Sequence, residues 1–291
     1  MAWDNVLPAT WTWDADRAVI GGVALDEIAD AVGTPCYVVD EAHLAGRLSR
    51  FRAAFGPDVG LVYAAKAFWC LAMAETLAPA GWMADVVSEG ELAIALAGGL
   101  SPSRILVHGN VKTDREIELA IAAGVARIVV DAPDEMRRVV AIADGRRVEL
   151  MLRLNIDVGA DTHPKIRTTG AAAQFGMTTR QADEALGVVG PGVSVRGVHV
   201  HIGSQLRDPR LHAEALTEVG RFVEERRERF GDTGSFDLDI GGGFPVAYLH
   251  TDVIEPLEAF ADAILSAASG FPEARILVEP GRSVVATAGV S

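Results

Sequence analysis

Eight short apolar segments recur along most of this chain, and stretches with helical patterning separate them. Their β-branched, nearly continuous apolar character predicts strands of a parallel sheet that is covered on both faces. Eight such units in 291 residues predict an α/β fold of the (β/α)8 TIM-barrel type. An open, doubly wound sheet uses the same alternation, but no Gly-x-Gly-x-x-Gly sequence opens the chain. The predicted strands are Gly60–Ala65, Met83–Val87, Ile105–His108, Arg127–Val130, Val148–Leu154, Val195–His201, Phe236–Ile240 and Arg275–Val278.

The connections between these segments carry helix signals. Glu89–Ala97 and Asp114–Ala123 have helical patterning, and the glycines that follow them, Gly98 and Gly124, suit helix C-terminal caps. One connection, Asp157–Gly192, is much longer than the others. Long connections in compact domains are usually functional or disordered, so we expect a functional loop here that faces the barrel's active end.

Composition narrows the class of protein. The net charge of −14 argues against nucleic acid or an anionic membrane as a partner, because both require a positive surface. No apolar run approaches the length of a membrane span, and no basic stretch precedes an apolar core near Met1. We therefore expect a cytoplasmic protein in a reducing compartment. Its two cysteines, Cys36 and Cys70, are interpreted as buried structural thiols.

Polar and charged residues gather where the predicted strands end, whereas the strand interiors are aliphatic. In a barrel of parallel strands these ends meet on one face, where barrel enzymes place their active sites. The sequence therefore predicts a site assembled from distant segments. Its candidate residues are Lys66, Asp85, Ser88, His108, Asn110, Arg153, Asn155, His201, Gly241, Gly242, Gly243, Glu279 and Arg282.

The residue types suit pyridoxal 5'-phosphate chemistry, and no metal site is predicted. The amine of Lys66 can bind an aldehyde covalently, and a carboxylate such as Glu279 can keep a pyridine nitrogen protonated. Glycines 241–243 allow backbone amides to approach a phosphate, to which Ser204 could add a hydroxyl. Each feature alone also has a structural explanation. Lys66 could extend to solvent and Glu279 could simply pair with Arg282.

Nine segments together resemble the fold-type III family of pyridoxal-phosphate-dependent decarboxylases, from about residue 33 to the end. They are Gly33–Asp40 (GTPCYVVD), Tyr63–Ala67 (YAAKA), Asp85–Glu91 (DVVSEGE), His108–Lys112 (HGNVK), Leu152–Asn155 (LRLN), Thr169–Gly170 with Phe175–Gly176, His199–Gln205 (HVHIGSQ), Asp239–Phe244 (DIGGGF) and Glu279–Arg282 (EPGR). Three of these, HGNVK, HIGSQ and the Thr-Gly…Phe-Gly pair, favour members acting on diaminopimelate over those acting on ornithine.

The resemblance implies roles for individual residues. Lys66 is the Schiff-base lysine, His201 stacks on the cofactor ring, and Glu279 contacts the pyridine nitrogen. Arg282 also meets an amino-acid substrate. The remaining cofactor-binding residues implied are Asp85, Ser204, Gly241, Gly242, Gly243, Pro280 and Gly281, with His199 in a supporting position.

The implied reaction converts meso-2,6-diaminopimelate into L-lysine and CO2, the last step of lysine biosynthesis. The implied assembly is a homodimer whose sites lie between subunits. Two alternatives stay open. One is a related decarboxylase for ornithine, arginine, carboxynorspermidine or a secondary-metabolite amino acid, and the other is a non-enzymatic, regulatory cofactor-binding homologue.

The chain departs from the family pattern at several places. Gln174 stands where the family usually has lysine, and Phe68 and Trp69 follow Lys66 where an asparagine is usual. A Cys-Glu pair and a tyrosine, which the family's C-terminal β domain supplies to the partner's site, are also lacking, and Cys70 is no obvious substitute. We expect residues 1–32 to associate with a β-rich domain, 33–282 to form the barrel, and 283–291, a β-prone run, to begin a truncated β domain.

Overall fold

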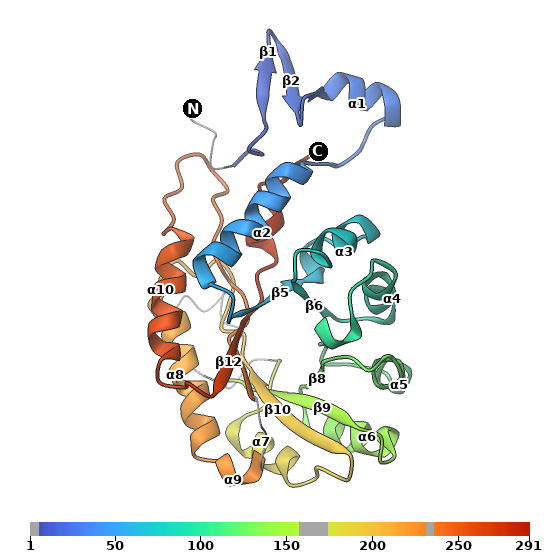
Figure 1. Ribbon diagram of the computed structural model, residues 1–291, viewed down its shortest axis with the longest axis vertical. Helices are drawn as coiled ribbons and strands as arrows, with labels where there is room; N and C mark the ends of the chain where they lie inside the picture. The colour runs from blue at the N-terminus through green and yellow to red at the C-terminus, as the bar shows by residue number, and fades with distance from the viewer. Residues whose placement is uncertain (1–5, 157–173, 231–235) are drawn as a thin grey trace.

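Eight parallel strands form a closed barrel, as predicted (Figure 1). The computed structural model describes residues 6–156, 174–230 and 236–291. The strands follow chain order around the barrel, and pairing of the last with the first closes it. They are β5 (Gly60–Ala64), β6 (Met83–Val86), β7 (Ile105–Val107), β8 (Arg127–Val130), β9 (Val148–Arg153), β10 (Val193–His199), β11 (Phe236–Asp239) and β12 (Ala274–Val278).

Helices follow the strands and cover the outside of the barrel (Figure 1). Two of them confirm the predicted ranges 89–97 and 114–123, and the glycine after each is its C-cap. They are α2 (Glu41–Phe55), α3 (Leu71–Leu77), α4 (Glu89–Ala97), α5 (Asp114–Ala123), α6 (Pro133–Ala143), α7 (Thr179–Leu186), α8 (Arg210–Glu224), α9 (Arg227–Phe230) and α10 (Leu257–Ala268), with 3-10 turns η1 (Ala65–Ala67) and η2 (Pro102–Arg104). Within the described ranges, no helix has the length and apolar character that a membrane span requires.

The long connection predicted for Asp157–Gly192 is not a loop throughout. It contains α7, which a capping box starts: Thr178 accepts from the Gln181 amide, and the Gln181 side chain accepts from the Thr178 amide. This two-sided bonding satisfies free amides of the first turn and makes a helix stable there. Residues 157–173 of the connection, with His163, Pro164 and the Thr-Gly pair, lie outside the described residues.

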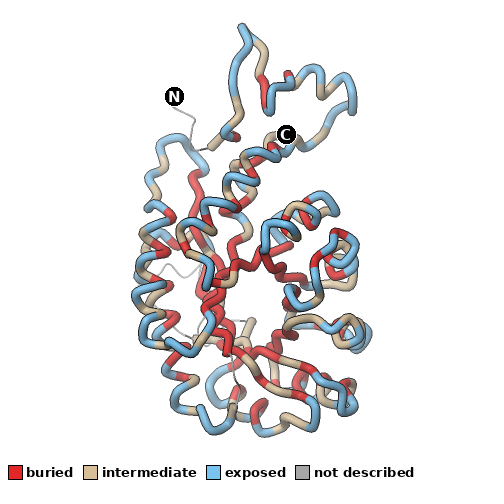
Figure 2. The backbone as a smooth tube through the Cα atoms, viewed as in Figure 1, coloured by how far each residue is buried: buried red, intermediate tan, exposed pale blue. Residues whose placement is uncertain are grey.

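Two apolar clusters hold the barrel together. Buried residues, red in Figure 2, are concentrated along the barrel strands. The larger cluster lies between the strands and the surrounding helices. A separate small cluster contains six buried residues, one from each of six strands. Since both faces of the strands are buried, their sequences are apolar without alternation. The small cluster consists of Val62, Met83, Leu106, Val129, Met151 and Leu277.

Residues outside the barrel form two small sheets (Figure 1). The first contains β1 (Thr12–Asp14), β2 (Arg17–Ile20) and β3 (Val23–Ala24), and helix α1 (Leu25–Val32) follows it. The second pairs β4 (Val38–Val39) with β13 (Gly289–Val290) and so brings segments from near the two ends of the chain together. The predicted β-prone run 283–291 is only partly correct, because α11 (Arg282–Val285) occupies its start.

Charged residues at the amino ends of the strands form a buried network opposite the predicted site. Asp237 of β11 is almost fully buried and accepts from Arg275 at 2.8 and 3.1 Å. Arg127 of β8 lies 2.9 Å from the same carboxylate and also binds Glu149 at 2.6 Å. This network ties four strands together at the end of the barrel where barrel proteins place stabilising residues.

We predict that Asp237→Ala lowers the free energy of unfolding by about 3–5 kcal/mol, because it removes the buried carboxylate that Arg127 and Arg275 share. Arg115→Ala is the matched control, since it breaks the exposed Arg115–Glu89 pair and should cost about 0–1 kcal/mol. Urea unfolding of both variants measures the difference. Equal losses for the two would contradict a stabilising role for the buried network.

Candidate active site

A cavity of about 390 Å³ opens at the carboxyl end of the barrel. Its walls come from the residues that follow β5, β10, β11 and β12, together with α11. The volume is within the range of small-molecule sites. Polar and glycine residues predicted from the sequence line it: Lys66, His201, Ser204, Gly243, Glu279, Gly281 and Arg282.

Lys66 lies in the 3-10 turn directly after β5 and is exposed to the cavity. The chain has only three lysines. The ammonium of Lys112 is buried and hydrogen-bonded away from the cavity, and Lys165 lies outside the described residues. Among the described residues, Lys66 is therefore the one lysine whose amine can meet a ligand in this cavity.

Glu279, directly after β12, is buried between two histidines. Its Oε1 lies 2.9 Å from His108 Nε2, and its Oε2 lies 3.2 Å from His199 Nε2. Burial alone would raise the pKa of Glu279, but its interactions with the two imidazoles outweigh that effect and hold the pKa well below its ordinary value. The carboxylate is therefore ionised at neutral pH.

Two further buried carboxyl groups behave differently. Burial, with the negative charge of Glu279, raises the pKa of Asp239 well above its ordinary value. Burial also raises the pKa of Asp85, and the nearby His108 only partly offsets this. The cluster therefore concentrates its negative charge on Glu279, the one of these three acids that reaches the cavity.

His201 follows β10 and lines the cavity as a neutral ring. Burial, with the charge of Lys66 as a further cause, lowers its pKa to about 3. Its Nδ1 accepts the amide hydrogen of Gly242 at 3.3 Å, which orients the imidazole. A neutral, oriented ring of this kind can lie against an aromatic ligand without a charge penalty.

The three glycines after β11 are required by close backbone contacts. Gly241 has φ +69° and Gly243 has φ +95°, conformations that favour glycine. A Cβ on Gly241 would lie 2.6 Å from the carbonyl oxygen of Val200, and one on Gly242 would collide with the carbonyl of Glu279. The backbone here runs so near β10 and β12 that only Gly-Gly-Gly fits, and its third residue forms part of the cavity wall.

Arg282, the first residue of α11, supplies an exposed cation at the cavity. Its guanidinium donates to the hydroxyl of Tyr248 and lies 5.9 Å from the centre of that ring. The alternative in which Glu279 simply pairs with Arg282 does not match these contacts, because Glu279 binds histidines instead. Tyr248 was missed at the sequence level, since nothing nearby in the chain marks it.

His212 of α8 is another residue that the sequence analysis missed. It is fully buried, its Nε2 is 2.9 Å from the carbonyl oxygen of Gly242, and its ring stacks on Phe244. Burial lowers its pKa to about 4, so it is neutral at pH 7 and can donate to that carbonyl. A single polar residue on a helix is a weak signal, and only the packing of α8 reveals its role in supporting the glycines.

Several predicted site residues lie outside the cavity lining. Gly241, Gly242 and Pro280 form backbone behind it, while Asp85 lies beside His108. Ser88 instead caps α4 by accepting from the Glu91 amide. Asn110, Arg153 and Asn155 are at the same end of the barrel but do not line the cavity.

The residues present fit pyridoxal phosphate. Glu279 Oε1 is buried without a hydrogen bond of ordinary geometry among the described residues, so a protonated pyridine nitrogen could satisfy it. The glycine segment, Ser204 and Arg282 provide groups that can bind an anion in the same cavity. His108, His199 and Glu279 also offer donor atoms within 4.8 Å of one another, a spacing that could accept a metal ion.

Comparison with known proteins agrees with this geometry. Residues 41–286 match the family model described as "Pyridoxal-dependent decarboxylase, pyridoxal binding domain". Diaminopimelate decarboxylase of Actinosynnema pretiosum subsp. auranticum is 36% identical over 283 residues, which are 94% of this chain and 63% of that protein.

Comparison with solved structures also matches this chain to decarboxylases. A diaminopimelate decarboxylase from M. jannaschii in complex with L-lysine superposes with a TM-score of 0.87 at 34% identity, covering 96% of this chain and 68% of that one. A lysine/ornithine decarboxylase from Vibrio vulnificus, complexed with putrescine, superposes with a TM-score of 0.78 at 28% identity, covering 91% of this chain and 68% of that one.

The chain spans 63 to 66% of the length of the first curated relatives that it matches. The matched region contains the whole barrel and every residue that lines the cavity. On the family model, the sequence identity and the shared barrel, the chain belongs to the family of pyridoxal-dependent decarboxylases and contains that family's pyridoxal-binding domain.

Proposed function

We propose that this chain is the cofactor-binding part of an amino-acid decarboxylase that converts meso-2,6-diaminopimelate into L-lysine and CO2. One observation carries the proposal: a cavity lined by an accessible lysine, Lys66, is also lined by a buried and ionised carboxylate, Glu279. Relatives named diaminopimelate decarboxylase, at 34 to 37% identity, support the choice of substrate.

Pyridoxal phosphate, when bound, supplies an electron-accepting ring that stabilises the charge left behind when CO2 departs. Lys66 provides the amine that binds the cofactor covalently. Glu279, held anionic by its two histidines, keeps a proton on the pyridine nitrogen, and His201 packs against the ring. Gly243, Ser204 and Arg282, which line the cavity, bind the phosphate, and Gly241 and Gly242 form the backbone that holds Gly243 there. Arg282 also meets the substrate carboxylate.

We further propose a cytoplasmic homodimer in which the partner subunit completes each site, as the family resemblance implies. Among the described residues that line the cavity there is no cysteine, and Glu279 is the one carboxylate. We assign the proton donor to the product to a group from outside this lining. We also propose that residues 1–32 and 283–291 associate with a β-rich domain. The β4–β13 pair, in which Gly289–Val290 binds Val38–Val39 outside the barrel, supports that assignment for residues 283–291.

Borohydride reduction in the presence of pyridoxal phosphate should attach the cofactor to Lys66 alone, and peptide mass spectrometry locates the adduct. Lys66→Arg keeps the charge but removes the reactive amine, so this variant should give no adduct. A reduced adduct on Lys112 or Lys165 with Lys66 unmodified would overturn the assignment.

Two isosteric variants test where the cluster holds its charge. Glu279→Gln should lower kcat by about 10²–10³-fold, because it removes the anion that faces the pyridine nitrogen. Asp239→Asn should change kcat by less than about tenfold, because Asp239 already favours its neutral form. Steady-state kinetics on both variants measure the contrast, and a larger loss in Asp239→Asn would reverse the two roles.

A substrate panel tests the reaction itself. With pyridoxal phosphate present, we expect CO2 release from meso-diaminopimelate with kcat/KM at least about 100-fold above that for ornithine, arginine or lysine, a discrimination of about 2.7 kcal/mol. Preference for lysine or ornithine would instead support the second candidate, for which the similarity to the Vibrio vulnificus enzyme is the motivating observation. Cofactor binding without turnover of any of the four would argue against a decarboxylase active as this chain alone.

A further inference from the structure

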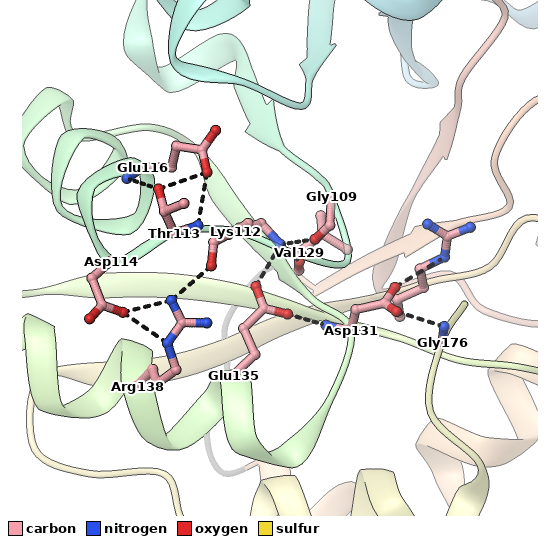
Figure 3. Close-up of polar contacts among 11 residues, drawn as sticks. Gly109, Lys112, Thr113, Asp114, Glu116, Val129, Asp131, Glu135, Arg138 and Gly176 are labelled. Atoms are coloured by element: carbon pink, nitrogen blue, oxygen red, sulfur yellow. Dashed lines mark hydrogen bonds and ion pairs between the residues drawn. The ribbon is translucent and has the colours of Figure 1, made fainter. Parts of the chain in front are cut away.

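A buried lysine joins two consecutive strand–helix units of the barrel near the site (Figure 3). Lys112, in the connection from β7 to α5, is only 3% exposed. Its ammonium donates at 2.6 Å to the carbonyl oxygens of Gly109 and Val129 and to Glu135 at the start of α6. All three of its hydrogens are thus used, and the lysine is fixed in position.

Glu135 links Lys112 to the residue that follows β8. One of its oxygens binds Lys112, and the other accepts the backbone amide of Asp131 at 2.8 Å (Figure 3). Asp131 directly follows β8, so the buried ion pair determines where its backbone leaves the barrel. A carboxylate and an ammonium this deeply buried hold their geometry because every alternative leaves a charge unpaired.

The Asp131 side chain then holds two elements of the next connection. Its Oδ2 accepts the amide of Gly176 at 2.9 Å, and its Oδ1 lies 3.6 Å from Nε of Arg153 at the end of β9. Phe175 precedes Gly176, and its ring centre is 4.8 Å from the Arg153 guanidinium. One carboxylate therefore fixes both partners of a cation–π contact.

Gly176 is suited to this attachment. Its φ is +78°, and a Cβ there would lie 2.8 Å from the carbonyl carbon of Leu154. The turn can approach the end of β9 this closely only with glycine. Met177 then continues in a bridge with Leu154, so Gly176 and Met177 are bound to the strand that ends in Arg153.

Arg153 adjoins the cofactor site through the backbone. It is the register partner of His199, the last residue of β10, and the amide of Leu154, which follows Arg153, donates to the carbonyl oxygen of His199 at 2.8 Å. His199 Nε2 in turn lies 3.2 Å from Glu279. The guanidinium therefore stands at a strand end that is hydrogen-bonded to the histidine partner of Glu279, so a change in its position changes the surroundings of that buried cluster.

We infer that Asp131 is a positioning residue of the cofactor site, which holds the Arg153 guanidinium and the Phe175–Gly176 turn in place and is itself held by the buried Lys112–Glu135 pair. The inference deepens the proposed function and rests on it for the identity of the cofactor. Nothing in the reaction requires Asp131 to touch the cofactor; it acts through Arg153.

Cofactor affinity tests the link to Arg153 in a double-mutant cycle. Asp131→Asn, which keeps the shape and an oxygen acceptor for Gly176, should weaken the Kd for pyridoxal phosphate about tenfold. In an Arg153→Gln background the same change should alter Kd less than twofold, because the group it positions is gone. A tenfold loss in both backgrounds, or no loss in the parent, overturns the inference.

The control for this cycle is Arg138→Gln. Arg138 binds the backbone carbonyl of Lys112 from the outside at 2.7 Å and pairs with Asp114, so its loss disturbs the same connection without touching Asp131 (Figure 3). Its Kd should stay within twofold of the parent. A tenfold loss here would mean that any disturbance of the connection suffices, which also overturns the specific role of Asp131.

Hydrogen exchange tests the support of Asp131 without any cofactor. Glu135→Gln replaces the charged acceptor of the Asp131 amide with a neutral one, and we expect the Gly176 amide to exchange at least about tenfold faster, although Glu135 does not bind it. Unchanged exchange at Gly176 overturns the support by Lys112–Glu135. If the parent chain binds no pyridoxal phosphate, the proposed function fails, and this exchange result still decides the structural part of the inference.

Discussion

Closure of the barrel is the constraint on which the rest of this structure depends. β12 pairs with β5 through Leu277–Gly60 and Val278–Leu61, and the absence of a side chain at Gly60 leaves room for the end of the Leu277 side chain. This pairing joins strands that are more than two hundred residues apart in the chain. Lys66 and Glu279, which follow the two strands, therefore line one cavity.

The parallel direction of the strands makes the two ends of the barrel different. At the amino ends, Asp237 and its arginines form a closed ion network that ties strands together. At the carboxyl ends, Asp85, Asp239 and Glu279 are buried, and the partners of Glu279 are the histidines His108 and His199 in place of arginines. Glu279 is held ionised in a buried site by its contacts with the two histidines, whereas burial raises the pKa values of its neighbours Asp85 and Asp239. The residues that stabilise the barrel thus lie at one of its ends, and the residues of the candidate active site lie at the other.

The support behind the cavity is as specific as its lining. His212 holds the carbonyl of Gly242, Tyr248 holds Arg282, and Asp131 holds Arg153. Each supporting residue lies on a different element from the residue it holds. A side chain that binds a cofactor must keep one position closely. This arrangement achieves that, because packing and hydrogen bonds from the supporting residues fix its rotamer.

The sequence by itself determined the barrel, because the period of apolar segments and the glycine caps are local signals that survive without tertiary context. It also determined the lysine, the glycines and the Glu279–Arg282 segment, since each stands at the end of a predicted strand. Only the tertiary structure decided that Glu279 lies between His108 and His199, that Ser88 is a helix cap and that α7 and α11 are helices. Those facts depend on contacts across the barrel and on short helices with few local signals. Burial and contacts across the barrel, which together shift the pKa values of Glu279, Asp239 and Asp85, are properties of the folded chain and have no counterpart in the order of its residues.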